Sequence, residues 1–99
     1  MKNSPTSPYV LAFAELMEYK LSKNRHKGDR EGWRNLSYAQ LLKFLHQEVT
    51  ELDNVISNDL SPWPEFQRKV KLEAADVANF AMMIADRVGD EVSAVEGKA

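Results

Sequence analysis

The stretch LEAADVANFAMMIAD, residues 72–86, predicts a helix whose largely apolar body carries two acids three positions apart. Glu73 and Asp76 share one side of this helix, and Phe80 and Met83 continue that side, because residues three and four apart are neighbours on a helix surface. Carboxylates on an apolar surface must be solvated, paired with a cationic side chain or neutralised by a metal ion. This stretch therefore predicts a solvated face, an ion pair or a metal site.

The chain length allows a single domain. We expect it to span residues 1–99, with a flexible segment at 1–7 and a frayed end at 90–99. The apolar fraction of 43% and the charged fraction of 28% are typical of a folded globular protein rather than a disordered tail. A domain this short buries a modest core, so partner subunits would add to its stability.

Composition also excludes several classes of function. The sequence contains no cysteine, so any metal must be held by oxygen or imidazole. The net charge of −2 argues against a nucleic-acid partner, since a surface that follows phosphates needs a basic excess. No apolar run approaches the roughly 18 residues that span a bilayer, and the N-terminus lacks an apolar signal segment. We therefore expect a cytoplasmic protein with no membrane partner.

Helical periodicity predicts three main helices and no strand. Ser7 followed by Pro8 favours a helix start, with the serine accepting a first-turn N–H, and the apolar spacing extends this helix to about residue 23. The segment 24–36 is charged, contains two glycines and lacks apolar periodicity, which predicts a loop. A loop of this length in so small a domain is more often functional than incidental.

The second and third helices have clearer boundaries. Ser37 with Gln40 three residues on is a capping box, and it predicts a helix from there to about Ile56. The third helix begins near Pro62 or Pro64 and continues to Gly89, a plausible residue for ending a helix. We expect an all-α fold: an antiparallel bundle of three main helices plus a short C-terminal segment, completed by oligomerisation.

Each of the two later helices carries an apolar seam that we expect to form the core. The seams consist of Leu42, Leu45, Val49, Leu52 and Ile56 on the second helix and Val70, Val77, Ala81, Ile84 and Val88 on the third. A second stripe, turned by about 100° on the second helix, places Glu48 and Glu51 between Phe44 and Val55. Both helices thus carry an acid pair at a spacing of three residues, flanked by apolar residues.

If these acidic stripes face each other, four carboxylates converge and raise each other's pKa unless a cation intervenes. Mg²⁺ or Mn²⁺ suits such a set, because both ions prefer carboxylate oxygens and Mg²⁺ often shares its shell with substrate phosphates. The alternative is that the four acids are ordinary surface residues, some of them paired with lysine or arginine. The four are Glu48, Glu51, Glu73 and Asp76.

The two motifs QEVTE, residues 47–51, and EAAD, residues 73–76, give the chain a resemblance to a known family. It resembles the MazG-like nucleotide pyrophosphohydrolases of the all-α NTP pyrophosphatase superfamily, whose pattern is EExxE on one helix and ExxD on the next. The resemblance covers about residues 37–88. Gln47 stands where the family has glutamate, which affects whatever supporting or additional-metal role that first acid plays.

The resemblance implies a ligand set and a reaction. The Mg²⁺ ligands would be Glu48, Glu51, Glu73 and Asp76. The reaction would cleave a nucleoside triphosphate between the α and β phosphates, giving the monophosphate and pyrophosphate. A carboxylate that the metal does not fully engage can accept the proton of the attacking water, and Glu48 and Glu51 are the two candidates.

The loop offers candidate substrate-binding residues. Lys27, Arg30 and Arg34 can pair with phosphates, and Trp33 can stack on a base. The alternative is a solvated charged loop in which the tryptophan fills the core. Asn79, one turn after the second acid pair, can hydrogen-bond the nucleotide or orient a ligand; otherwise it is a polar residue facing solvent or capping a neighbouring helix.

The leading hypothesis is a Mg²⁺-dependent nucleoside triphosphate pyrophosphohydrolase, of the house-cleaning kind, that acts on an NTP or dNTP as a homodimer or higher homo-oligomer. One alternative is a phosphoribosyl-ATP pyrophosphohydrolase, which shares the fold and the acidic motifs. Another is a non-catalytic helical interaction module that keeps the acids for metal-dependent stability or nucleotide sensing. The isolated His26 and His46 are interpreted as structural in all three.

Overall fold

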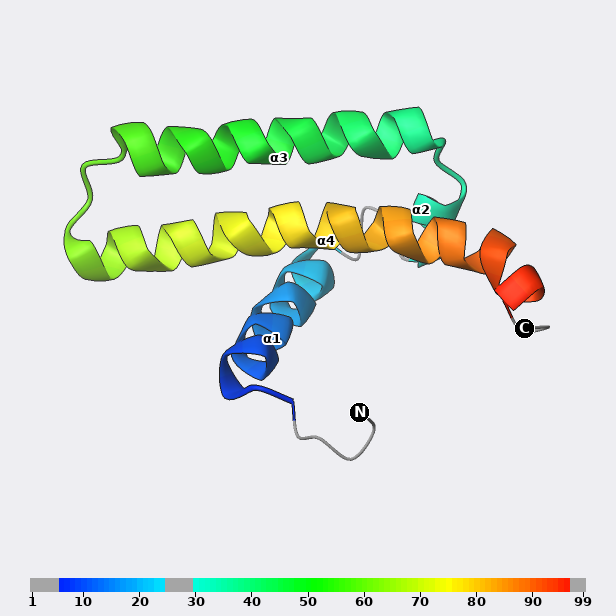
Figure 1. Ribbon diagram of the computed structural model, residues 1–99. Coiled ribbons are helices and arrows are strands. Elements are labelled where there is room, and N and C mark those ends of the chain that lie inside the picture. Colours follow the sequence, from blue (N-terminus) through cyan, green and yellow to red (C-terminus); the bar gives the residue numbers. More distant parts are fainter. Residues whose placement is uncertain (1–5, 25–29, 97–99) are drawn as a thin grey trace.

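The computed structural model describes residues 6–24 and 30–96, with side chains described up to residue 88. Every regular element in these ranges is a helix, which confirms the all-α class. The elements are α1 (Pro8–Lys23), α2 (Arg30–Arg34), α3 (Tyr38–Asn58) and α4 (Trp63–Glu96). Figure 1 shows α3 and α4 running side by side in opposite directions, with α1 crossing α4 at a steep angle.

The α3–α4 hairpin forms where the sequence predicts it. Ser37 Oγ accepts a hydrogen bond from the Gln40 backbone N–H at 3.1 Å, and Gln40 Oε1 accepts one from the Ser37 N–H at 2.9 Å. This reciprocal pair confirms the capping box and fixes the start of α3. The helix continues two residues past the expected end at Ile56, so the turn into α4 is correspondingly short.

A small polar cluster fastens that turn. The Asp59 carboxylate accepts hydrogen bonds from the Ser61 N–H at 2.8 Å and from Lys69 Nζ at 3.0 Å. Lys69 Nζ also donates to Ser61 Oγ at 2.9 Å, and together these partners lower the pKa of Asp59 to about 2. The lysine comes from the second turn of α4, so the cluster ties the end of one helix to the start of the next.

Helix α1 does not run antiparallel to the hairpin, so the expectation of a simple antiparallel bundle is wrong for this element. It crosses α4 instead, and the Asn79 side-chain N–H₂ donates to the Met17 carbonyl at 3.0 Å where the two helices meet. Ser7 does precede the helix, but its side chain accepts no cap hydrogen bond. Its carbonyl accepts from the N–H groups of Val10 and Leu11 instead, both at 3.0 Å.

Two further boundaries differ from the sequence-based expectation. The segment expected to be a loop contains the short helix α2, and α4 continues through Gly89 to Glu96 instead of ending there. A glycine inside a helix costs only about 1 kcal/mol relative to alanine, so packing and neighbouring hydrogen bonds easily override it. Residues 90–96, expected to form a separate segment, are therefore part of α4.

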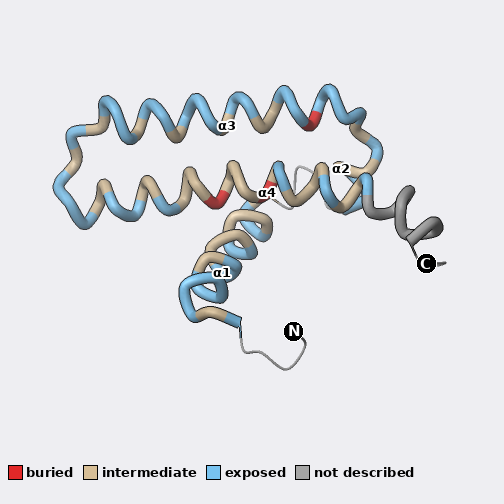
Figure 2. Tube along the Cα trace, viewed as in Figure 1, coloured by how far each residue is buried: buried red, intermediate tan, exposed pale blue. Residues whose placement is uncertain are grey.

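The buried positions of α3 and α4 differ from the expected seams, and Figure 2 shows how few positions of the hairpin are fully buried. Leu42, Val49 and Ile56 are 48%, 45% and 56% exposed, whereas Leu41 is fully buried. The Phe44 and Phe80 rings, from the stripes that carry the acids, lie with centroids 5.8 Å apart between α3 and α4. The expected seam of α3 is therefore only partly buried, because Leu45 and Leu52 are half-buried while its other members are exposed.

No helix in the described ranges combines the length and apolarity needed to cross a membrane.

Candidate metal and substrate site

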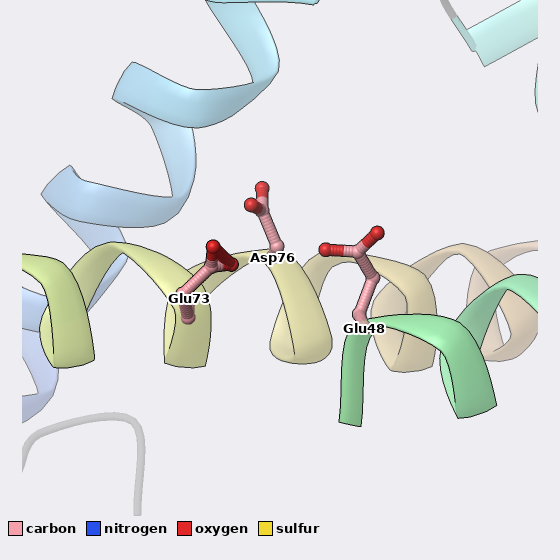
Figure 3. A group of neighbouring side chains, drawn as sticks. All are labelled: Glu48, Glu73 and Asp76. Carbon is pink, nitrogen blue, oxygen red and sulfur yellow. The ribbon is translucent and has the colours of Figure 1, made fainter. Parts of the chain in front are cut away.

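Three of the four predicted acids converge between α3 and α4. Glu48 from α3 and Glu73 and Asp76 from α4 each offer a carboxylate oxygen, and these oxygens lie within 4.8 Å of one another. Figure 3 shows the three side chains leaning toward a common space on the side of α4 that α1 approaches. Residues 48 and 73 are far apart along the chain, so only the antiparallel hairpin brings these groups together.

Local sequence explains how each carboxylate reaches this space. The spacing of three residues places Glu73 and Asp76 on the same side of α4, one turn apart. Glu48 follows Phe44 by one turn of α3, and the contact of Phe44 with Phe80 sets that face of α3 against α4. Apolar residues flanking the acids thus bring the acidic stripes face to face.

Burial, together with the charge of the neighbouring acids, raises the pKa of two members of this cluster. Burial raises the pKa of Glu48 to about 7, with further contributions from the carboxylates of Glu51 and Asp76. Burial also raises the pKa of Glu73, and Glu51 and Asp76 add to that shift. The protein by itself therefore does not fully neutralise the cluster, and Glu48 titrates near neutral pH.

The residues present fit a hard divalent cation. The donor set consists of carboxylate oxygens, which Mg²⁺ and Mn²⁺ prefer. Glu73 Oε2 is buried, and no partner among the described residues donates a hydrogen bond to it. A buried carboxylate oxygen without a donor is costly, and a cation would remove that cost. Glu51, the fourth predicted ligand, is exposed and lies outside the group of three.

One cationic side chain already contacts the cluster. Lys20, from the last turn of α1, places its Nζ 3.2 Å from Asp76 Oδ2. The two side chains are 22% and 16% exposed, so this pair is largely shielded from solvent. It lowers the pKa of the neighbouring Glu73, although less than burial and the other acids raise it. The sequence left three environments open for Asp76: solvent, an ion pair or a metal ion. In this structure Asp76 forms an ion pair.

A cavity of about 730 Å³ opens onto the carboxylates. Its polar wall includes all four predicted acids, and Phe44, Phe80 and Met83 provide an apolar wall. Lys20 and Trp33 also line it, so α1, α2, α3 and α4 all contribute to this cavity. Its size falls within the range of about 300–1,000 Å³ that is usual for small-molecule sites.

The two described arginines that were predicted to bind phosphates are paired with a carboxylate of α4 instead. Arg30 makes two hydrogen bonds to the Asp86 carboxylate, from Nε at 3.1 Å and from Nη2 at 2.9 Å. Arg34 Nε lies 3.9 Å from the same carboxylate. Neither arginine lines the cavity, so the structure does not bring them to the carboxylate cluster. The third predicted cation, Lys27, lies outside the described residues, as does His26.

Trp33 anchors α2 to α4 and also lines the cavity. Its indole Nε1–H donates to Asp86 Oδ2 at 3.0 Å, which fixes the orientation of the ring and anchors α2 to α4. The residue is half-buried and also lines the cavity. The tryptophan is therefore a structural anchor that presents part of its surface to the candidate site.

Asn79 follows Asp76 by one turn of α4 and is 3% exposed. Its amide nitrogen donates to the Met17 carbonyl in the interior of α1, so it contacts that helix without capping it. Its Oδ1 is buried without a partner among the described residues, and Asn79 lines the cavity. A buried acceptor of this kind is suited to a donor group of a ligand.

Sequence reasoning missed Lys20 and Asp86. Lys20 follows Met17 by three positions and precedes Asn24 by four, so it lies within the stripe of α1 that packs against α4. A lysine in the middle of an inward-facing stripe was the available signal. Asp86 carried a weaker signal, because its partners on α2 belong to a segment with no apolar periodicity.

Comparison with known proteins adds no relative. No family model, curated protein or solved structure matches the chain. The geometry of the site and the motif resemblance are therefore what support a function.

Proposed function

We propose that this protein is a Mg²⁺-dependent nucleoside triphosphate pyrophosphohydrolase resembling the MazG-like enzymes. One observation carries the proposal: Glu48, Glu73 and Asp76 offer mutually adjacent carboxylate oxygens at the wall of a cavity of about 730 Å³. An all-carboxylate cluster beside a nucleotide-sized cavity suits phosphate chemistry, because Mg²⁺ bound by carboxylates commonly shares its shell with substrate phosphates.

In this proposal the three carboxylates hold the cation and Glu51 acts on water. Bound Mg²⁺ would supply charge neutralisation for the phosphate oxygens and for the leaving pyrophosphate. Glu51 lines the same cavity beside Glu48 but outside the group of three, and in this proposal its carboxylate accepts a proton from the attacking water. This assignment chooses between the two candidate bases, Glu48 and Glu51, on geometry.

The other cavity residues would position the nucleotide. Trp33 is fixed by its hydrogen bond to Asp86 and offers an aromatic surface for a base. Asn79 Oδ1 would accept a hydrogen bond from an amino or hydroxyl group of the substrate. These roles support an NTP or dNTP as substrate without selecting one base.

The test is pyrophosphate release from a panel of ribo-, deoxyribo- and modified nucleoside triphosphates, with and without Mg²⁺. We expect Glu73→Gln to lower kcat/KM by about 100-fold or more and to weaken Mn²⁺ binding, since loss of even a supporting residue costs about 10–100-fold. Glu51→Gln should lower kcat by about 10²–10⁴-fold with Mn²⁺ affinity retained, as expected for a general base.

Asp53→Asn is the matched control, because Asp53 is an exposed acid on α3 outside the cavity lining. It should leave both turnover and Mn²⁺ affinity unchanged. If no nucleotide on the panel releases pyrophosphate, the proposed activity is wrong, and phosphoribosyl-ATP becomes the next substrate to assay. If Mn²⁺ binds and raises the Tm but neither substrate is cleaved, the non-catalytic module is the better description.

We further propose that a second copy of this chain covers the exposed seam of α3. Leu42, Val49 and Ile56 recur at the seven-residue spacing that helix–helix seams between subunits use. The chain exposes 7360 Å², whereas a compact folded protein of its mass exposes about 5,700 Å². The excess is larger than the roughly 800 Å² that each partner buries in a standard interface.

A further inference from the structure

Lys20 lies at the candidate metal site but comes from a different element than the acids. Its Nζ is 3.2 Å from Asp76 Oδ2, and it lines the cavity together with Glu48 and Glu73. Lysine is a point charge on a flexible four-carbon stem, so its ammonium group can move several ångströms while its backbone stays in place.

The backbone of α1 is held at this point. Asn79 binds the Met17 carbonyl at 3.0 Å, one turn before Lys20, and Asn79 itself is 3% exposed. Leu21 and Asn24, which follow Lys20, also line the cavity. The anchored helix therefore keeps the lysine at the cavity wall whether or not its ammonium group contacts Asp76.

Electrostatic repulsion disfavours the present position of the ammonium group once a dication binds the Asp76 oxygen that it contacts. The ammonium and a dication on the same carboxylate would lie a few ångströms apart in a half-buried space, where like charges repel strongly. A triphosphate or pyrophosphate brings several negative charges into the cavity, and lysine is a common partner for phosphate oxygens.

We propose that Lys20 is an exchangeable cation of the site: it neutralises Asp76 in the metal-free protein and moves to a phosphate oxygen of the ligand when a divalent ion binds Asp76. This inference rests on the cation site of the proposed function. It assigns to Lys20 a phosphate-binding role in addition to its present contact with Asp76. It also predicts that binding of the metal and binding of phosphate depend on each other.

The experiment measures binding of Mn²⁺ alone, and then of inorganic pyrophosphate with Mg²⁺ present, to the wild-type chain, Lys20→Met and Lys20→Arg. Removing the competing ammonium should tighten Mn²⁺ binding by at least about fivefold in Lys20→Met, a typical coupling between two ligands. The same variant should bind pyrophosphate at least about fivefold more weakly. Lys20→Arg keeps the charge and should stay within about twofold of wild type for Mn²⁺.

The control is Lys23→Met, because Lys23 lies on α1 over the Tyr19 ring and does not line the cavity. It should change neither affinity, and circular dichroism checks that all three variants fold. Unchanged or weaker Mn²⁺ binding in Lys20→Met would overturn the exchange, and so would unchanged pyrophosphate binding. If Lys20→Met shows both expected changes in affinity but the wild-type chain hydrolyses no nucleotide, the proposed reaction is wrong and the exchange is still supported.

Discussion

The pKa of the Glu48 carboxyl group depends strongly on its surroundings. It lies half-buried beside Glu51 and Asp76, and burial together with those charges raises its pKa to about 7. Asp86 shows the opposite shift, because hydrogen bonds from Arg30 and Trp33 lower its pKa to about 2. No cationic side chain among the described residues pairs with Glu48, whereas Arg30 and Arg34 both pair with Asp86.

The raised pKa of Glu48 predicts how stability depends on pH without metal. Between the unfolded value of 4.5 and the folded value of about 7, the unfolded chain loses this proton while the native state keeps it. Native stability therefore falls as pH rises through that window. We expect the Tm of the metal-free protein to be lower at about pH 8 than at about pH 5, and Mg²⁺ to raise it more at the higher pH.

Thermal melts of the wild type and of Glu48→Gln, with and without Mg²⁺, check this expectation. The glutamine has no proton to lose, so the variant should show a clearly smaller fall in Tm over the same pH range. A residual slope is expected from Glu73, whose pKa is also raised. A metal-free Tm that stays level or rises from about pH 5 to about pH 8 would contradict the burial of these acids.

At the scale of elements, α2 is a five-residue helix that depends on one carboxylate of α4 for its position. Arg30 and Trp33 both donate to Asp86, and a helix this short cannot persist by its own hydrogen bonds. Since Trp33 also lines the cavity, the Asp86 anchor links the position of α2 to the shape of the candidate site.

Asp86→Asn should therefore lower the Tm by a few degrees at neutral pH and weaken nucleotide binding through loss of the ordered tryptophan. Because the pKa of Asp86 is lowered from 3.8 to about 2, its contribution is present above about pH 4 and disappears as the pH falls through about 2. The Tm difference between variant and wild type should shrink over that range. Tryptophan fluorescence and melts measure both effects.

Glu15→Gln, at an exposed acid of α1, is the control for this change. It should leave the Tm and the tryptophan signal unchanged. A Tm for Asp86→Asn equal to that of wild type at neutral pH would show that α2 is held by something other than Asp86.

At the scale of the whole molecule, the chain is more extended than a compact domain of its length. Its radius of gyration is 15.7 Å, whereas about 12.6 Å is expected for 99 residues. Among the described residues, Leu41 and Ala75 are the buried apolar core. So small a core favours a protein that gains stability from a partner subunit.

The proposed pairing of two copies through α3 predicts a dimer in solution. Val49→Glu places a charge at the centre of the exposed seam and should convert the protein to a monomer with a lower Tm, measured by light scattering and thermal melts. Asn54→Glu, at an exposed position away from the seam, is the matched control and should remain dimeric. A wild-type chain that is monomeric at all concentrations would contradict the pairing.

The sequence by itself determined the all-α class, the ends of α1 and the start of α3, because helical periodicity and the capping box are local properties. It also identified Glu48, Glu73 and Asp76 as acids on facing stripes of two helices, since the side of a helix on which a residue lies is fixed by 3.6 residues per turn. Only the tertiary structure decided that Leu41 is buried while Leu42, Val49 and Ile56 stay exposed, because burial depends on which side of α3 meets another helix.

Tertiary structure also decided the contacts between distant segments. The pairing of Lys20 with Asp76, and of Arg30 and Trp33 with Asp86, joins residues more than fifty positions apart. Such pairs depend on where α1 and α2 pack against α4, and side-chain packing is set by the whole fold. The sequence therefore specified the acids and their helices, and the packing of those helices specified what each acid contacts.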